Sequence, residues 1–295
     1  MNNNEGDRIS ELPGSVLHHI LSFFDLKPAI QTSILSTKWR YVWRSLPFLN
    51  FHCNQFYSFE TKRADGFVDF VDHVLNLLDS SSSIRKFHLS CFIKIDHSDI
   101  EDRLCRWILT ALESNVEDLY LLISVGDEFQ LPQCLFSCKS LRKLELQFYG
   151  HHPLHKLNLP DSMNLPGLKT LVLGGFRIEA DDILNKIFSS CCVLESLKLT
   201  DSVFYQTRLD ISAPQLKHLV ILNYDYTVYD EIDINKYIIK LYAPNLISFC
   251  CHDYMSKDYY VLNLSALVKA EIDMDVEVYD KDGHPRLDEK CMRNG

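Results

Sequence analysis

The stretch that decides the fold is Leu141-Arg-Lys-Leu-Glu-Leu146, a phrase of the pattern L-x-x-L-x-L. Similar phrases begin at Ile84, Val116, Leu141, Leu168, Leu194, Leu216, Leu246 and Leu267. The steps between successive phrases run from 21 to 32 residues. Self-similarity at such a period indicates a repeat architecture, in which one small supersecondary unit recurs along the chain.

Two positions of each phrase carry the apolar side chains. The fourth position holds Phe87, Leu119, Leu144, Leu171, Leu197, Leu219, Phe249 and Ala270, and the sixth holds Leu89, Leu121, Leu146, Leu173, Leu199, Ile221, Cys251 and Ile272. A strand places positions i and i+2 on one face, so each phrase is predicted to be a strand. Parallel stacking would join these faces into one core. We therefore predict an α/β protein with an irregular, curved leucine-rich-repeat solenoid of parallel strands.

Three segments outside the phrases show helical spacing. Their apolar positions are Phe67, Phe70, Val71, Val74 and Leu78 in the first, Ile100, Leu104, Trp107, Ile108 and Ala111 in the second, and Ile183, Leu184, Ile187 and Phe188 in the third. The first helix precedes the repeats and would shield them. The other two would return the chain from one strand to the next.

The first fifty residues predict a separate unit of three helices. Ser15 can cap a helix, Pro28 suits the first turn of a second helix, and Ser36 can cap a third. Their apolar stripes are Val16, Leu17, Ile20, Leu21 and Phe24, then Ile30, Ile34 and Leu35, then Trp39, Val42, Trp43 and Leu46. So short a unit seldom completes its own core, and we expect part of its apolar surface to need a neighbour.

Composition narrows the class of protein. The chain has 295 residues, of which 46% are hydrophobic, and a formal charge of −10, so a broad nucleic-acid interface is disfavoured. No apolar run reaches the ~18 residues of a membrane span, and the first residues lack a secretory pattern. We expect an intracellular protein of the nucleus or cytoplasm, without a membrane partner, whose ten cysteines are thiols.

A family resemblance enters with the N-terminal motifs. They are Asp7-Arg-Ile-Ser-Glu-Leu-Pro13, Val16-Leu-His-His-Ile-Leu-Ser-Phe-Phe24 and Gln31-Thr-Ser-Ile-Leu-Ser-Thr-Lys-Trp-Arg-Tyr-Val-Trp43. Together they resemble an F-box of the plant F-box/leucine-rich-repeat type, FBD-associated group. Members of this group commonly continue into a further C-terminal domain, whereas the leucine phrases here stop near Val276. We expect a frayed C-terminal end.

The resemblance implies that the F-box docks on the Skp adaptor of a cullin-RING ubiquitin ligase. By position, the adaptor contacts would be Leu12, Pro13, Ile20, Leu21, Ile34, Leu35 and Trp39. Apolar residues at helical spacing can equally be core, which is the alternative for Ile20 and Ile34. Leu12 and Pro13 favour contact, because proline holds an extended approach and leaves Leu12 outside any stripe.

A second binding surface is predicted on the repeats. The outward positions between the buried columns form a face of mixed charge that suits a protein substrate, and include Lys143, Glu145, Thr170, Val172, Ser196, Lys198, His218 and Val220. The alternative for each residue is that it is merely solvated.

Catalytic motifs are missing from the sequence. There is no GxxxxGK[ST] phosphate loop, no HExxH zinc pair and no GxSxG elbow, so we expect no enzyme activity and no cofactor. His151, His152 and His155 form a histidine cluster beside Pro153, but no fourth ligand lies at zinc-site spacing. A metal enzyme hidden in the repeats is the least favoured alternative.

These expectations give a domain plan and a function. The plan is an F-box at 7–47, a connecting segment with a helix at 48–83, about eight repeat phrases at 84–276 and a polar tail at 277–295. The resemblance implies a substrate-recognition subunit of an SCF-type ligase, which holds a protein substrate near charged ubiquitin. The alternative is an interaction protein that does not form an active ligase.

Overall fold

The computed structural model describes residues 11–37, 39–58, 66–78, 84–91, 99–126, 129–149, 155–178, 183–204, 208–223, 237–254, 257–275, 278–279 and 285–286. The chain forms two compact units. Unit 1 comprises residues 1–150 and 160–168, and unit 2 comprises residues 151–159 and 169–295. As predicted, N-terminal helices precede parallel strands.

Unit 1 begins with four short helical segments. They are α1 (Gly14–Leu21), α2 (Leu26–Gln31), the 3₁₀ helix η1 (Thr32–Ile34) and the 3₁₀ helix η2 (Trp39–Ser45). The first helix starts at Gly14 rather than after a Ser15 cap, because the carbonyl oxygen of Pro13 accepts from the backbone N–H groups of Val16 and Leu17 at 2.9 and 3.1 Å. The predicted third helix is a 3₁₀ helix throughout its described part.

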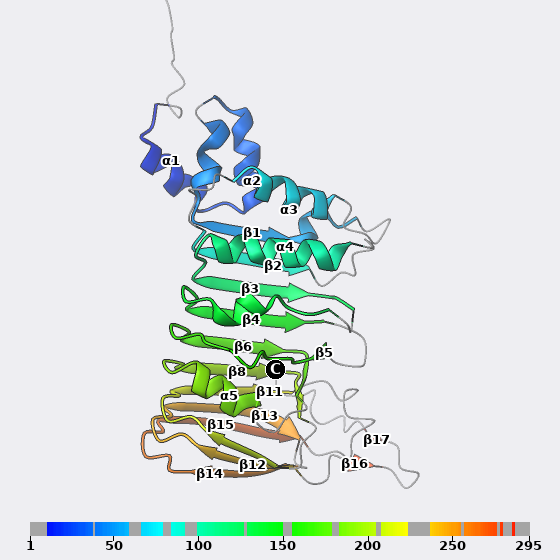
Figure 1. The fold of residues 1–295 in the computed structure, drawn as a ribbon, viewed down its shortest axis with the longest axis vertical. Helices are drawn as coiled ribbons and strands as arrows, with labels where there is room; N and C mark the ends of the chain where they lie inside the picture. The colour runs from blue at the N-terminus through cyan, green and yellow to red at the C-terminus, as the bar shows by residue number, and fades with distance from the viewer. Residues whose placement is uncertain are drawn as a thin grey trace, which may run out of the picture. The chain divides into compact units, whose positions relative to one another are not determined.

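Four parallel strands of unit 1 lie side by side in chain order (Figure 1). They are β1 (Phe48–His52), β2 (Lys86–Cys91), β3 (Asp118–Ile123) and β4 (Lys143–Phe148). The strands of this unit thus begin at β1, in the segment predicted to be a connector. A signal was present, since Leu46-Pro-Phe-Leu49-Asn-Phe51 follows the same leucine pattern.

Helices cover the inward face of these strands. The predicted connecting helix is α3 (Phe67–Asn76), and the predicted return helix is α4 (Ile100–Glu113). The 3₁₀ helices η3 (Cys53–Phe56) and η4 (Gln133–Ser137) complete the returns. The inward side chains of the predicted columns are buried: Phe87, Leu89, Leu119, Leu121, Leu144 and Leu146. Leu49 and Phe51 of β1, which the columns did not include, are buried as well.

Unit 2 continues the same construction with five parallel strands in the order β6-β8-β11-β13-β15. They are β6 (Thr170–Gly174), β8 (Ser196–Thr200), β11 (His218–Leu222), β13 (Ser248–Tyr254) and β15 (Lys269–Asp275). The predicted helix between β6 and β8 is α5 (Ile183–Ser190). All eight predicted phrases therefore contain a strand that begins two residues after the phrase does.

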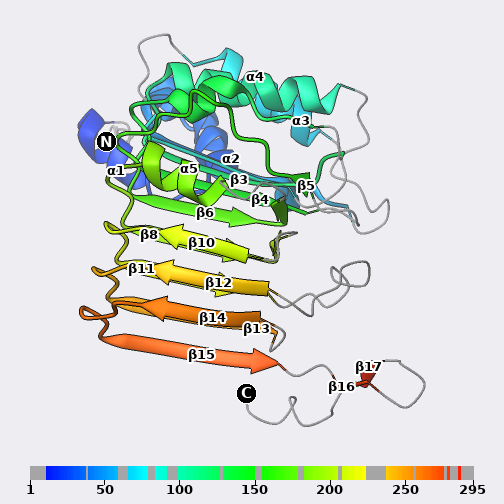
Figure 2. The ribbon, with the colours of Figure 1, turned by 60° about the horizontal axis from the view of Figure 1, so that its bottom comes forward.

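The return segments of unit 2 are largely extended. Parallel strands β10 (Arg208–Ser212), β12 (Tyr237–Tyr242) and β14 (Lys257–Leu262) form a second sheet, which Figure 2 shows as a layer over the first. A smaller parallel sheet joins β5 (His155–Lys156), β7 (Phe176–Ile178) and β9 (Val203–Phe204). An antiparallel pair, β16 (Val278–Tyr279) and β17 (Pro285–Arg286), follows β15.

The inward columns of unit 2 are buried up to β13 and exposed in β15. Phe249 and Cys251 are 4% and 1% exposed, whereas their register partners Ala270 and Ile272 are exposed, Ile272 by 59%. The core therefore ends at β13, one strand before the last strand of the sheet.

Small residues fill the turns that precede the strands. Burial raises the pKa of one of them, the Cys191 thiol, to about 12.

A buried polar contact closes one turn of unit 2. The backbone N–H of Ser202 donates to Oδ1 of Asn223, at 3.1 Å, and both residues are at most 2% exposed. Asn223 lies on the neighbouring coil, so the contact joins two successive repeats. A buried backbone donor must be satisfied, so this contact contributes to stability.

Replacing Asn223 by alanine leaves the Ser202 N–H buried without its acceptor. We expect Asn223→Ala to lower the free energy of unfolding by about 1–3 kcal/mol. The control is Asn245→Ala, which removes an amide donor to the carbonyl oxygen of Pro214 at an exposed site and should cost less than about 1 kcal/mol. Urea unfolding of both variants measures the difference, and equal losses would contradict this role.

Candidate protein-interaction surfaces

Several apolar side chains of the N-terminal helical segments of unit 1 are exposed. Phe23 is 76% exposed and Ile34 is 88% exposed. The set, which we call the helical apolar surface, consists of Val16, Phe23, Phe24, Ile34, Leu35 and Tyr41. Beneath it the core holds Leu17, Leu21, Leu26, Ala29, Trp39, Trp43 and Leu46. Large exposed apolar groups on so small a unit are typical of a surface that another protein covers.

The structure divides the seven predicted adaptor residues. Ile34, Leu35 and Pro13 are exposed, and Leu12 and Ile20 are half-buried. Leu21 and Trp39 are instead 0% and 3% exposed, so they support the surface from within and offer almost no contact area. Ile34 and Leu35 turn outward because η1 ends at Ile34, which breaks the helical stripe that the sequence suggested.

Sequence reasoning did not assign four members of the helical apolar surface to the adaptor contact: Val16, Phe23, Phe24 and Tyr41. Val16 and Phe24 were placed on the apolar stripe of the first helix, but Val16 is 38% exposed, and α1 ends at Leu21 and leaves Phe24 45% exposed. Phe23 and Tyr41 carried no signal, because an aromatic residue beyond a helix end can be either core or surface. Only the observed end of α1 places Phe23 outside.

A cation–π cluster fixes the helical unit against the first repeat. The Lys27 ammonium lies 4.0 Å from the centroid of the Phe56 ring, and it donates to the backbone carbonyl oxygen of Gln55 at 2.8 Å. Phe56 in turn packs edge-on against Phe67 and tilted against Phe70 of α3, with ring centroids 5.7 and 5.0 Å apart. Elements α2, η3 and α3 therefore share one contact, which holds the helical unit in a defined orientation within unit 1.

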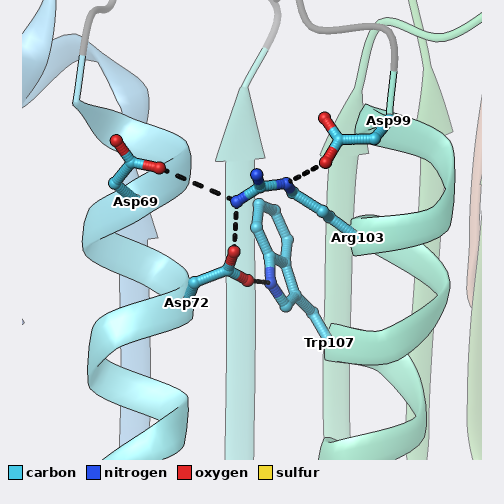
Figure 3. Close-up of polar contacts among 5 residues, drawn as sticks. All are labelled: Asp69, Asp72, Asp99, Arg103 and Trp107. Carbon is cyan, nitrogen blue, oxygen red and sulfur yellow. Dashed lines mark hydrogen bonds and ion pairs between the residues drawn. The ribbon is translucent and has the colours of Figure 1, made fainter.

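A second cluster joins α3 to α4, as Figure 3 shows. The Arg103 guanidinium reaches across to Asp72 and Asp69 of α3, and its Nε donates at 2.7 Å to Asp99, the residue before α4. The other oxygen of Asp72 accepts from Trp107 Nε1 at 2.6 Å. Arginine suits this place because its planar head serves several carboxylates at once.

This cluster joins two helices of unit 1. Asp72 and Trp107 also line a hollow of about 300 Å³ between the two helices. Both oxygens of Asp72 are engaged with Arg103 and Trp107. The cluster holds α4, the first return helix, on α3, the connecting helix.

The outward strand face of unit 1 carries Lys143 and Glu145, as predicted. Their side chains pair at 3.2 Å, and Gln147 Nε2 donates to Glu145 at 2.6 Å. On the neighbouring strands, His88 Nε2 lies 3.4 Å from Asp118 Oδ1. Burial acts to raise the pKa of Asp118, but His88, Lys143 and Lys86 outweigh it and lower that pKa. The face thus keeps a carboxylate charged among basic groups.

The outward face of unit 2 follows the predicted columns with one exception. Thr170, Ser196 and His218 align in register, and His218 Nδ1 lies 2.8 Å from the Ser248 hydroxyl. Val172 aligns with Lys198 and Val220, but Val172 is only 6% exposed and offers little surface to a partner. The remaining residues give this face the hydroxyl groups of Thr170 and Ser196, the Lys198 cation, the His218 imidazole and the apolar side chain of Val220.

Other kinds of site gain no support from the described residues. Within the described ranges, no three His, Cys, Asp or Glu side chains are grouped so that they could hold a metal ion. His151 and His152 lie outside those ranges, and His155 is buried in β5. No helix of the described part has both the length and the apolarity to cross a membrane. The described cysteines form no disulfide.

Comparison with known protein families gives one match to the N-terminal helical unit and one match to the repeats. A model of the F-box domain matches residues 9–51, and a model described as "FBD-associated F-box protein At5g56370, LRR repeats" matches residues 104–263. The chain belongs to the F-box/LRR-repeat family. F-box domains in general bind the Skp adaptor of SCF ubiquitin ligases, and the repeat model covers more than half of this chain.

Curated relatives in Arabidopsis thaliana extend the similarity over most of the chain. F-box/LRR-repeat protein At4g14103 is 36% identical over 272 residues, which cover 91% of this chain and 68% of the relative. F-box/LRR-repeat protein At4g14096 is 35% identical, with 91% of this chain and 54% of the relative covered. The chain thus spans between half and just over two thirds of these relatives' lengths. No solved structure matches it significantly.

Arg103 is expected to be needed for the attachment of α4 to α3. Arg103→Met leaves Asp72, Asp69 and Asp99 close together without their shared cation, so the melting temperature should fall. The matched control is Arg106→Met, because Arg106 lies three residues further along the same helix and is exposed. Thermal unfolding followed by circular dichroism measures both variants. If Arg106→Met were as destabilising as Arg103→Met, the cluster would have no special role.

Asp118 is expected to make stability depend on pH. Its folded pKa lies below its unfolded value of about 3.9, so its contribution is complete above that value and is lost as pH falls through the folded pKa. Wild type should therefore exceed Asp118→Asn in stability at neutral pH, and the gap should narrow near pH 3. Urea titrations at both pH values test this, with exposed Glu113→Gln as the control. A gap independent of pH would refute it.

Proposed function

We propose that this protein is the substrate-recognition subunit of an SCF-type cullin-RING ubiquitin ligase. The observation that carries the proposal is that an F-box at residues 9–51 stands in one chain with leucine-rich repeats at residues 104–263. The helical apolar surface supports the F-box half, since Ile34 and Leu35 are exposed at positions where the family resemblance implies adaptor contact.

In the proposed contact with the adaptor, buried residues of the helical unit hold the exposed side chains in place. Leu21 and Trp39 fill the core of the helical unit, so that the exposed side chains above them are held in place before binding. A rigid apolar surface loses little conformational entropy when a partner covers it. Leu12, Pro13, Ile20, Ile34 and Leu35 are the residues that we propose to contact the Skp adaptor, and through it the cullin-RING ligase.

The mechanism requires position rather than catalysis. Lys27 and Phe56 fix the orientation of the F-box on the first repeat, and Arg103 continues this attachment through α3 to α4. A substrate held on the strand faces would then remain near a ubiquitin carrier bound through the adaptor, and its effective concentration there would rise. F-box/LRR proteins are generally adaptors without enzyme activity, in keeping with this role inside the cell.

The substrate is proposed to be a protein held on the outward strand faces. Lys143 and Glu145 belong to the face of unit 1, and the face of unit 2 carries Thr170, Ser196, Lys198, His218 and Val220. Their mixed charge and short polar side chains suit directional contacts with a polypeptide. The domain plan proposed with this function keeps the F-box at 7–47, the repeats at 84–276 and the tail at 277–295, with β1 added to the connecting segment at 48–83.

The adaptor interface can be tested by charge on the helical apolar surface. Ile34→Asp and Leu35→Asp should each weaken co-purification with a Skp adaptor at least tenfold, because a carboxylate would be buried at the contact. The Leu12→Ala/Pro13→Ala double variant should also lose binding, whereas Val193→Asp, at an exposed apolar site in unit 2, should not. Undiminished binding by folded Ile34→Asp and Leu35→Asp would contradict the interface.

Ligase activity needs its own measurement. The purified complex with adaptor, cullin and RING subunit should transfer ubiquitin to a bound substrate, and the helical-surface variants should abolish that transfer. Stable adaptor binding without any ubiquitin transfer would instead favour an interaction protein that does not form an active ligase.

A further inference from the structure

The outward face of unit 2 holds a lysine that has no carboxylate beside it. Lys198 is the middle residue of β8 and points outward, between the buried side chains of Leu197 and Leu199. No ion pair or hydrogen bond joins its ammonium group to another residue of the described ranges. An open positive charge therefore lies in the middle of this strand.

Two other outward lysines show how the repeats usually neutralise such a charge. Lys143 on β4 and Lys269 on β15 each pair with the glutamate two residues further along the same strand, at 3.2 and 3.4 Å. On β8 the corresponding residue is Thr200, and the residue two places before Lys198 is Ser196. The strand thus supplies hydroxyl groups to Lys198 where the other strands supply a carboxylate.

The charges at the starts of the neighbouring strands do not neutralise Lys198 either. Lys169 and Lys217 precede β6 and β11, and Glu195 lies 3.9 and 3.3 Å from their ammonium groups. Over residues 169–174, 195–200 and 217–222 the sequence has three lysines and one glutamate, on a chain whose formal charge is −10. A local excess of positive charge on an acidic chain favours an anionic partner at this place.

Apolar neighbours on both sides hold the Lys198 side chain. In register with it stand Val172 of β6 and Val220 of β11, at the ~4.8 Å spacing of adjacent strands. A lysine stem packs along such side chains while its charged end stays at the surface. The two valines offer no hydrogen-bond acceptor, so the ammonium keeps its three donors for a partner.

Hydroxyl groups lie around the ammonium on two strands. Thr170 and Ser196 stand in register in the row before Lys198, and Thr200 follows it on β8. The hydroxyl groups of these three residues make no hydrogen bond within the part of the chain that the structure describes. A carboxylate placed on Lys198 can therefore accept from the ammonium and from a neighbouring hydroxyl, and hydrogen bonds to an ionised acceptor are the stronger kind.

We propose that Lys198 is the anchor at which the outward face of unit 2 binds an acidic segment of its protein substrate. An aspartate or glutamate carboxylate of that segment lies on the Lys198 ammonium, and Lys169 and Lys217 attract its other acidic side chains. The inference rests on the proposed function, which holds a polypeptide on this face, and it adds the chemistry of that polypeptide.

Binding of synthetic peptides to the full chain tests the chemistry. The probe is a short peptide of alternating aspartate and glycine that carries a neutral dye, and fluorescence anisotropy measures its affinity. Two further peptides replace the aspartates by asparagine or by phosphoserine. The aspartate peptide should bind at least tenfold more tightly than the asparagine peptide, which is about the effect of one lost charge pair at an interface.

Substitutions at Lys198 test the anchor. Lys198→Met keeps the stem and removes the charge, so it should weaken binding of the aspartate peptide about tenfold, whereas Lys198→Arg should retain binding. Lys240→Met is the matched control, because Lys240 lies on β12 in the second sheet of the same unit, the layer over the first sheet (Figure 2). Charges on another layer are screened by salt, so this control should change the affinity by less than about twofold.

Carbodiimide crosslinking locates the contact. The reagent joins an amine to a carboxylate without a spacer, so peptide mapping should find the aspartate peptide attached to Lys198. Lys269 should give little of this product, because Glu271 already occupies its ammonium group. A crosslink from Lys198 to a carboxylate of the same chain, in place of the peptide, would show that the chain supplies its own anion and would overturn the proposal.

Three other outcomes would also overturn it. They are equal affinity for the aspartate and asparagine peptides, an equal loss in Lys198→Met and Lys240→Met, and binding that requires phosphoserine. The proposed function fails separately, since adaptor co-purification is measured on the wild-type chain. A wild-type chain that binds the aspartate peptide through Lys198 but binds no adaptor would contradict the ligase role and would support the acidic-segment site.

Discussion

The structure depends on the parallel register that keeps two apolar columns of each strand on one side. Leu144 and Leu146 of β4 stand in register with Leu119 and Leu121 of β3, and all four are at most 1% exposed. A slip of one residue would bring Glu145 into the core and turn both leucines outward. Burial of the columns therefore determines the register, and the register determines which side chains form the outward faces.

Contacts of charged side chains, in addition to apolar packing, attach the F-box to the repeats. The Lys27 ammonium over the Phe56 ring joins α2 to η3, and Arg103 joins α3 to α4. Charged groups at such joints specify one orientation, because their contacts are directional. That orientation matters for the proposed receptor function, which is to hold one protein near another.

The predictability of each feature follows from how local its cause is. The columns from Phe87 to Cys251, and helices α3, α4 and α5, came directly from periodicity, since a strand or helix with one apolar face must bury it. β1 was not predicted, because its phrase overlaps the end of the N-terminal helices. The cluster around Arg103 had no sequence signal, because Asp72 and Arg103 are 31 residues apart and meet only when α3 and α4 pack.

The difference between what local sequence predicts and what tertiary packing decides is clearest for the surface residues. By itself, the sequence determined the family, the repeat period, the inward columns and the alternating outward positions, all of which follow from backbone geometry. Only the tertiary structure decided that Trp39 is buried while Ile34 is exposed, that Val172 is covered, and that Ala270 and Ile272 lie open. Periodicity states which residues share a face, but exposure depends on whether another element packs against that face.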